Sequence, residues 1–151
     1  EGKYPKVTLL HGNINDADLF KLYCDKTMVG LISATRGEGY GLPMIEAAAA
    51  GLPVLATDWS GHKTFLQEGC WIPVKYNMIN LPAQRTDNRI FMQNSRWADP
   101  LESSFKTGLT KLYNERKEYS KKAQEGRKII HSNFSQKSIE TFYKEFLEEL
   151  G

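Results

Sequence analysis

The chain has little cysteine, little net charge and no long hydrophobic run. No apolar stretch approaches the roughly 20 residues that a membrane-spanning helix needs. The formal net charge of +2 is too small to indicate a nucleic-acid partner. Cys24 and Cys70, the two cysteines, lie far apart in the sequence, which is typical of reduced core residues rather than a disulfide or metal pair. We therefore predict a cytoplasmic protein.

What is present fits one ordinary globular domain. The 151 residues are 40% hydrophobic and 25% charged, which suits a single hydrophobic core. The sequence has three histidines. None of them is spaced from cysteine or carboxylate residues as the ligands of a metal site are. The sequence therefore predicts no metal site.

Short apolar runs alternate with helical patterns along the first half of the chain. The expected strands are residues 7–11, 29–33, 53–57 and 70–74, and the expected helices are 17–24, 43–50 and 63–66. Such alternation is typical of a parallel sheet covered by helices on both faces. Further helices are expected at residues 101–116, 119–133 and 136–150. We predict an α/β fold with extra C-terminal helices, interrupted by a long polar and aromatic loop insertion at residues 75–99.

The most informative stretch runs from Glu38 to Glu46 and reads Glu-Gly-Tyr-Gly-Leu-Pro-Met-Ile-Glu. A glycine-rich loop between a strand and a helix start, with Pro43 at the beginning of the helix, is the usual construction of a phosphate site. Free backbone N–H groups and the positive end of the helix dipole both favour an anion there. The two carboxylates cannot bind that anion, whereas sugar and ribose hydroxyls suit them. The sequence therefore predicts a nucleotide diphosphate-sugar as ligand.

The run from Ser33 to Ala47, followed by Gly51–Asp58, resembles the donor-binding domain of retaining glycosyltransferases of family 4. Two glutamates separated by seven residues are the signature of that family. The resemblance implies a Rossmann-like parallel sheet, the C-terminal half of a two-domain GT-B fold. It further implies that residues 1–151 form a single nucleotide-sugar-binding domain, a fragment of an enzyme whose acceptor-binding N-terminal domain is missing from this chain.

The same resemblance assigns roles to particular residues. Glu38 would be the catalytic carboxylate beside the donor sugar, and Glu46 would bind the ribose hydroxyls. A solvated loop glutamate and a glutamate that only complements the helix dipole are the alternative interpretations. The remaining donor-binding candidates are Gly39, Tyr40, Gly41 and Leu42 through backbone N–H groups, and Gly12, Asn13 and Ile14 beside the base. For these two groups the alternatives are an ordinary strand-to-helix turn and a helix-capping turn.

Several other residues keep two interpretations. Arg36 either contacts the diphosphate or lies on the surface. His62 follows Ser60-Gly61, where the family often has two glycines, and is expected to be a loop or capping residue more than a catalyst. A basic helix with Lys121, Lys122, Arg127 and Lys128 is expected to be a solvated face, with peripheral membrane contact as the minority interpretation.

Taken together, the residues and the resemblance predict retaining glycosyl transfer from a nucleotide diphosphate-sugar, with no cofactor. Two alternatives stay open. The chain is a non-catalytic nucleotide-sugar-binding subunit that pairs with an acceptor-binding chain through the apolar stripe of Phe142, Phe146 and Leu150, or it is a GT-B-like epimerase or phosphorylase. Residues 75–99 are a candidate determinant of the acceptor because of their length and aromatic content.

Overall fold

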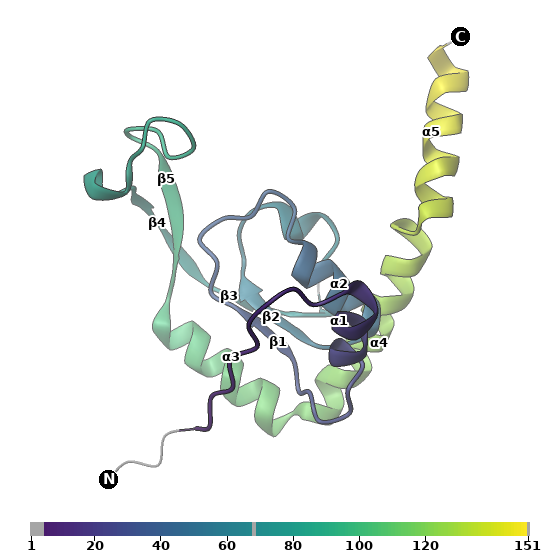
Figure 1. The fold of residues 1–151 in the computed structure, drawn as a ribbon, viewed down its shortest axis with the longest axis horizontal. Coiled ribbons are helices and arrows are strands. Elements are labelled where there is room, and N and C mark those ends of the chain that lie inside the picture. The colour runs from purple at the N-terminus through teal and green to yellow at the C-terminus, as the bar shows by residue number, and fades with distance from the viewer. Residues whose placement is uncertain (1–4, 68, 151) are drawn as a thin grey trace.

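A computed structural model describes residues 5–67 and 69–150. At its centre lies a parallel sheet in the order β1 (Leu31–Ser33), β2 (Val54–Thr57) and β3 (Ile72–Val74) (Figure 1). The register pairs Ile32 with Leu55, and Leu55 in turn with Ile72. The parallel α/β arrangement predicted from the sequence is therefore confirmed.

Helices cover the two faces of the sheet and extend beyond it. Their bounds are α1 (Asp16–Tyr23), α2 (Leu42–Ala50), α3 (Glu102–Asn114), α4 (Arg116–Asn133) and α5 (Gln136–Leu150). Because side chains alternate along a strand, β2 serves two cores. Val54 and Ala56 pack in a cluster with residues of α2 and α4, whereas Leu55 packs with Leu112 of α3. This is a Rossmann-like layering, with the extra C-terminal helices that the sequence predicted.

Local sequence sets the ends of the first helices. Asn15 caps α1, and its side-chain oxygen accepts a hydrogen bond from the backbone N–H of Asp18 at 2.9 Å. Gly51 ends α2 in the left-handed conformation, with φ of 80°. Asparagine at the start of a helix and glycine just after its end are residue types that satisfy the free backbone groups there.

The predicted strand at residues 7–11 is wrong. These residues have no regular secondary structure, and Val7 and Leu9 are 85% and 84% exposed. A β-branched, apolar composition favours a strand only where a neighbouring strand provides hydrogen bonds. Among the described residues none pairs with this segment. The core position expected for Cys24 is also wrong, because Cys24 caps the exposed end of α1.

The segment predicted as a long loop at residues 75–99 is folded. Antiparallel strands β4 (Tyr76–Asn80) and β5 (Arg96–Pro100) form a hairpin that we call the arm, residues 76–100. Its two ends lie together, since Leu101 N donates to Lys75 O at 2.8 Å. The strands are separated by a long tip that contains the short helix η2 (Ala83–Arg85), so no tight-turn signal reveals the hairpin.

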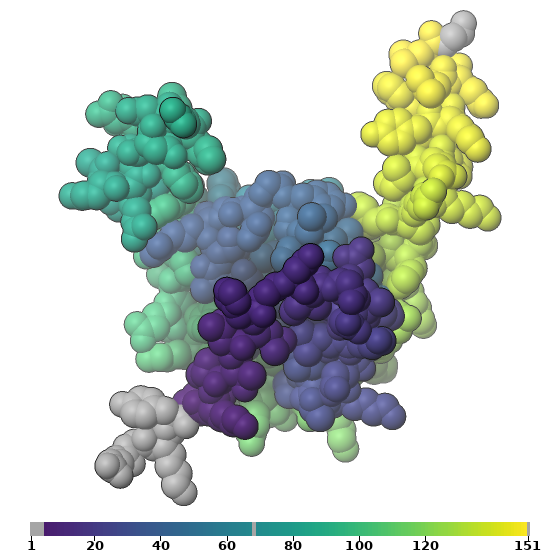
Figure 2. All heavy atoms as spheres, in the orientation of Figure 1, coloured from purple at the N-terminus to yellow at the C-terminus, as the bar shows by residue number. Residues whose placement is uncertain are grey.

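Two elements project from the body on the same side (Figures 1 and 2). One is the arm, and the other is α5, which continues outward from the end of α4. No described residue of α5 is buried, and Phe142 and Phe146 stack with their ring centroids 6.4 Å apart. In the space-filling view the two projections stand apart from each other above the body.

Candidate active site

The loop between β1 and α2, residues 37–41, is called the glycine loop here. Its last residue, Gly41, precedes α2 in the left-handed conformation with φ of 93° and provides no side-chain cap. Among the described residues no hydrogen-bond acceptor faces the backbone N–H groups of Gly39, Tyr40, Gly41 or Leu42. These donors and the positive end of α2 are therefore free to bind an anion.

A second loop, residues 58–62, lies directly against the glycine loop. Ser60 Oγ accepts from Glu38 N at 2.9 Å and donates to Glu38 O at 2.5 Å, and Gly61 N also donates to Glu38 O at 3.2 Å. The backbones approach so closely that a Cβ atom on Gly61 would lie 2.1 Å from Gly39 O. The backbone of Glu38 is therefore held on both its N–H and its carbonyl side. Gly61 and Ser60, the latter at a position where the family often has glycine, provide this support.

His62 is fully buried beneath the same contact. Its Nε2 lies 2.7 Å from Thr57 O, so Nε2 carries the proton and donates. Its Nδ1 has no hydrogen-bond partner among the described residues. A Cβ atom on Gly41 would come within 2.9 Å of the His62 Cβ. His62 therefore packs against the glycine loop from the protein interior and is not exposed to a ligand. Sequence patterns do not reveal this packing role.

Glu46 lies on the exposed side of α2, in its second turn, and is contacted by a residue that the sequence analysis missed. Tyr23, at the end of α1, donates its hydroxyl to Glu46 Oε2 over a long 3.4 Å. Burial, followed by the nearby Glu46 charge, raises the pKa of Tyr23, so the phenol stays a donor at neutral pH. Tyr23 is a buried residue of the core, and only the packing of α1 on α2 brings its hydroxyl beside Glu46.

Arg36 connects the glycine loop to the arm. Its Nε and Nη2 donate to Asp99 Oδ1 at 3.1 and 2.8 Å, and its guanidinium lies 4.7 Å from the centroid of the Trp97 ring. The backbone joins as well, because Ala98 N donates to Arg36 O at 3.1 Å. Arg36 therefore lies on the surface, with its side chain 51% exposed, and contacts the arm there. A role for Arg36 at a diphosphate stays a prediction.

The glycine loop and residues 58–62 lie together, but the third segment considered for the site, residues 12–14, is not joined to them. Gly12, Asn13 and Ile14 lie exposed in the irregular segment before α1. Within residues 5–67 and 69–150, no hydrogen bond joins these three residues to the glycine loop. Their placement beside a base therefore stays a prediction.

A cavity of about 510 Å³ opens between the glycine loop, residues 59–60 and the arm. We call it the arm cavity. Glu38, half-buried, lines it from the glycine loop, and Trp59, Phe91 and Trp97 contribute aromatic rings. Sequence analysis predicted Glu38 but not this enclosure, since the arm was not recognised as a hairpin.

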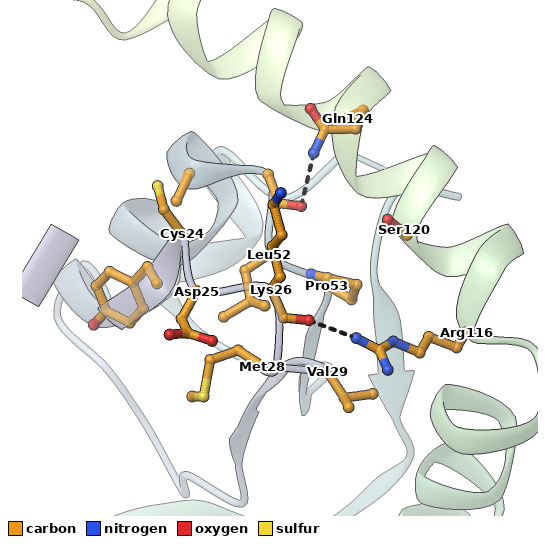
Figure 3. Close-up of a pocket in the computed structure, with 13 residues that line it drawn as sticks. Cys24, Asp25, Lys26, Met28, Val29, Leu52, Pro53, Arg116, Ser120 and Gln124 are labelled. Carbon is orange, nitrogen blue, oxygen red and sulfur yellow. Dashed lines mark hydrogen bonds between the residues drawn. The ribbon is translucent and has the colours of Figure 1, made fainter. Parts of the chain in front are cut away.

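A different cavity, of about 300 Å³, lies where β1 and β2 begin (Figure 3). Its principal polar side chains are already paired. Arg116 Nη2 donates to Lys26 O at 2.9 Å, and Gln124 Nε2 donates to Gly51 O at 3.2 Å, as the dashed lines show. None of the predicted site residues lines it. These bonds attach α4 to the body, and we assign the cavity no ligand.

In the part of the chain that is described, no group of three or more histidine, cysteine, aspartate or glutamate residues is arranged to hold a metal ion. The expectation that the reaction needs none stays a prediction. The described helices include none that is both long and apolar enough to traverse a bilayer. In the basic helix, Lys122 pairs with Glu118 at 2.6 Å and lies over Tyr119, which fits the expectation of a solvated mixed-charge face.

Comparison with known proteins places the chain in a family. Residues 3–78, half of the chain, match the glycosyl transferases group 1 family, and the chain belongs to it. The match includes every predicted site residue. Serotype-specific mannosyltransferase WbdA of Escherichia coli is 46% identical over 59 residues, which are 39% of this chain and 7% of that protein. Two further sequences of that name and organism agree to the same extent.

The chain thus corresponds to a small part of the length of these relatives. No solved structure matches it. Membership of the glycosyl transferases group 1 family is shown, whereas the activity, the donor, the stereochemistry and the acceptor belong to the proposal that follows.

Proposed function

We propose that this chain binds a nucleotide diphosphate-sugar and provides the donor-binding half of a retaining glycosyltransferase of family 4 with the GT-B fold. The observation that carries the proposal is the glycine loop, whose free N–H groups lie at the start of α2 between Glu38 and Glu46. An anion-binding backbone flanked by two carboxylates suits a ligand that joins a diphosphate to two hydroxyl-rich groups. Membership of the glycosyl transferases group 1 family supports the same chemistry.

Each part of the donor has a matching group. The diphosphate accepts hydrogen bonds from the N–H groups of Gly39 to Leu42, and the helix end offsets its charge without a metal. Glu46 accepts from the ribose hydroxyls, and such charge-assisted bonds contribute about 1.5–3 kcal/mol. Gly12, Asn13 and Ile14 line the base.

Glu38 has the catalytic role. Its backbone is fixed by Ser60 and Gly61, and its carboxylate faces the sugar near the anomeric carbon. Positive charge develops on that carbon as the bond to the diphosphate breaks, and a nearby carboxylate stabilises it. The backbone contacts matter because electrostatic stabilisation requires a group that is positioned before the reaction.

The acceptor is held chiefly by a domain outside this chain, and closure of the cleft between the two completes the site. The isolated chain therefore binds nucleotide and catalyses little. The alternative, a separate non-catalytic subunit, is supported by the exposed stripe of Phe142, Phe146 and Leu150 on α5. Sugar turnover by the isolated chain at a normal enzymatic rate would contradict both arrangements.

Calorimetric titration with nucleoside diphosphates and their sugars tests the donor site. Mannose is the first sugar to include, because the similar proteins are named as mannosyltransferases. We expect binding selective for one base and weakened about tenfold or more by Glu46→Gln. Glu148→Gln, on exposed α5, is the matched control and should bind as the unaltered chain does.

Equal affinity in the Glu46→Gln variant and the unaltered chain would contradict the assignment of the ribose site. Epimerised donor found in the absence of an acceptor would favour the epimerase alternative.

A further inference from the structure

The arm cavity has features that the donor proposal does not use. Six of its lining residues come from the arm and lie beyond residue 78, where the match to the family ends. The arm is nevertheless fixed to the glycine loop through Arg36, Asp99 and the Ala98 N–H. A segment outside the family match thus encloses space beside the residue proposed to be catalytic.

Aromatic rings form the walls of this cavity. Phe91 meets Trp97 edge to face, with ring centroids 6.3 Å apart. The ring centroids of Trp59 and Tyr76 are 5.5 Å apart. Trp59 and Phe91 are 38% and 44% exposed, so their rings are partly open to a ligand. Exposed rings with an apolar face and polar groups nearby are suited to molecules with both apolar and hydrogen-bonding surfaces.

The polar groups around the cavity are paired unevenly. The guanidinium of Arg36 is offset by Asp99, and Arg96 donates to Met78 O at 2.9 Å. By contrast, the buried indole Nε1 of Trp97 has no acceptor among the described residues. The half-buried Glu38 carboxylate also has no ion-pair partner there. The two arginines and the two carboxylates at the cavity nearly balance in charge, and Glu38 lies at its edge, which favours a neutral ligand with hydroxyl groups.

We propose that the arm cavity is an acceptor subsite that holds a sugar ring of a glycan next to Glu38. The proposal rests on the proposed function, because Glu38 marks where the donor sugar reacts. A sugar ring presents C–H groups to the faces of Trp59 and Phe91 and hydroxyls to the polar groups. A ring held there lies beside the anomeric carbon of the donor, so the arm selects which glycan is extended.

Intrinsic fluorescence of the chain reports on this subsite directly. Two of the three tryptophans, Trp59 and Trp97, line the cavity, whereas Trp71 is buried in the core. We would titrate neutral manno-oligosaccharides, with glucose oligosaccharides of equal length for comparison. We expect one of these two oligosaccharide series to change the tryptophan emission of the chain. The change should saturate below about 10 mM oligosaccharide, since sites of this size bind sugars weakly.

Phe91→Ala removes one wall and is expected to weaken the saccharide response about threefold to tenfold. Tyr113→Ala is the matched control, because Tyr113 is an aromatic residue 81% exposed on α3, away from the cavity. Both variants change a side chain that is largely outside the core, and thermal melting checks that each is folded. Equal effects of the two substitutions would overturn the proposal.

Nucleotide titration of the same samples separates this proposal from the donor proposal. Nucleotide affinity should be unchanged in Phe91→Ala. Nucleotide binding without any saccharide binding overturns the acceptor subsite and leaves the donor site standing. Saccharide binding without nucleotide binding contradicts the donor site instead. A Phe91→Ala variant that loses nucleotide affinity would make the cavity part of the donor site and would also overturn the proposal.

Discussion

The glycine loop is contacted by two segments that differ in almost every physical respect. The loop of residues 58–62 meets it backbone to backbone, above a fully buried His62 and without room for one more carbon at Gly61. The arm contacts Arg36, directly before the glycine loop, through the backbone N–H of Ala98 and the exposed pair of Arg36 and Asp99, at 51% and 41% exposure. The first contact fixes the shape of the loop, and the second adds a surface beside it. We therefore expect very different tolerance to substitution.

The largest effect is expected from Gly61→Ala. The added Cβ would lie 2.1 Å from Gly39 O, a backbone atom that moves only if the two loops separate. Separation breaks the bond from Gly61 N to Glu38 O and displaces the N–H groups proposed to bind the diphosphate. We expect nucleotide affinity to fall by more than about tenfold and the melting temperature to fall, as titration and calorimetry can measure.

Gly37→Ala is the matched control for this substitution. Gly37 lies in the glycine loop, on the other side of the same contact, and a Cβ atom there meets nothing within 4 Å. Similar losses in the two variants would mean that the loop is sensitive everywhere and that the close approach at Gly61 has no special role.

An intermediate effect is expected from Asp99→Ala, which breaks the contact to the arm. Because the pair with Arg36 is exposed, its loss should lower the free energy of unfolding by no more than about 1 kcal/mol. Amide exchange in β4 and β5 should become faster, while exchange in β2 stays as it was. A loss of stability well above this size would show that the arm contact is as rigid as the one at Gly61.

The smallest effect concerns pH at the tip of the arm. Asp87 Oδ1 accepts from the backbone N–H groups of Arg89, Ile90 and Phe91, and these bonds hold the pKa of Asp87 below its ordinary value of 3.8. A lowered pKa stabilises the folded tip above pH 3.8, and this stabilisation is lost as pH falls through the folded value.

We therefore expect the amide signals of Arg89 to Phe91 to shift on acidification while those of the glycine loop change little. Asp87→Asn keeps a neutral acceptor, so its tip should lack this transition. A transition that persists in Asp87→Asn would assign it to another group.

The difference between the two contacts also explains what the sequence could predict. Short-range sequence patterns predicted α1, α2 and the glycine loop, because the apolar runs, the glycines of the loop and Pro43 act within a few residues. They could not show that Gly61 touches Gly39, that His62 is buried, or that Tyr23 reaches Glu46, since these contacts depend on how elements pack. The strand predicted at residues 7–11 failed for the same reason, because a strand requires a neighbour that composition alone does not reveal.

The way the arm joins the body also determines whether the arm can be replaced by another hairpin. Its ends, Lys75 and Leu101, are joined by a backbone hydrogen bond of 2.8 Å, so a hairpin of another length can enter and leave at the same place without moving β3 or α3. Insertions at such adjacent ends are usually tolerated. A hairpin of different length or sequence can therefore replace the arm while the parallel sheet and the glycine loop keep their structure.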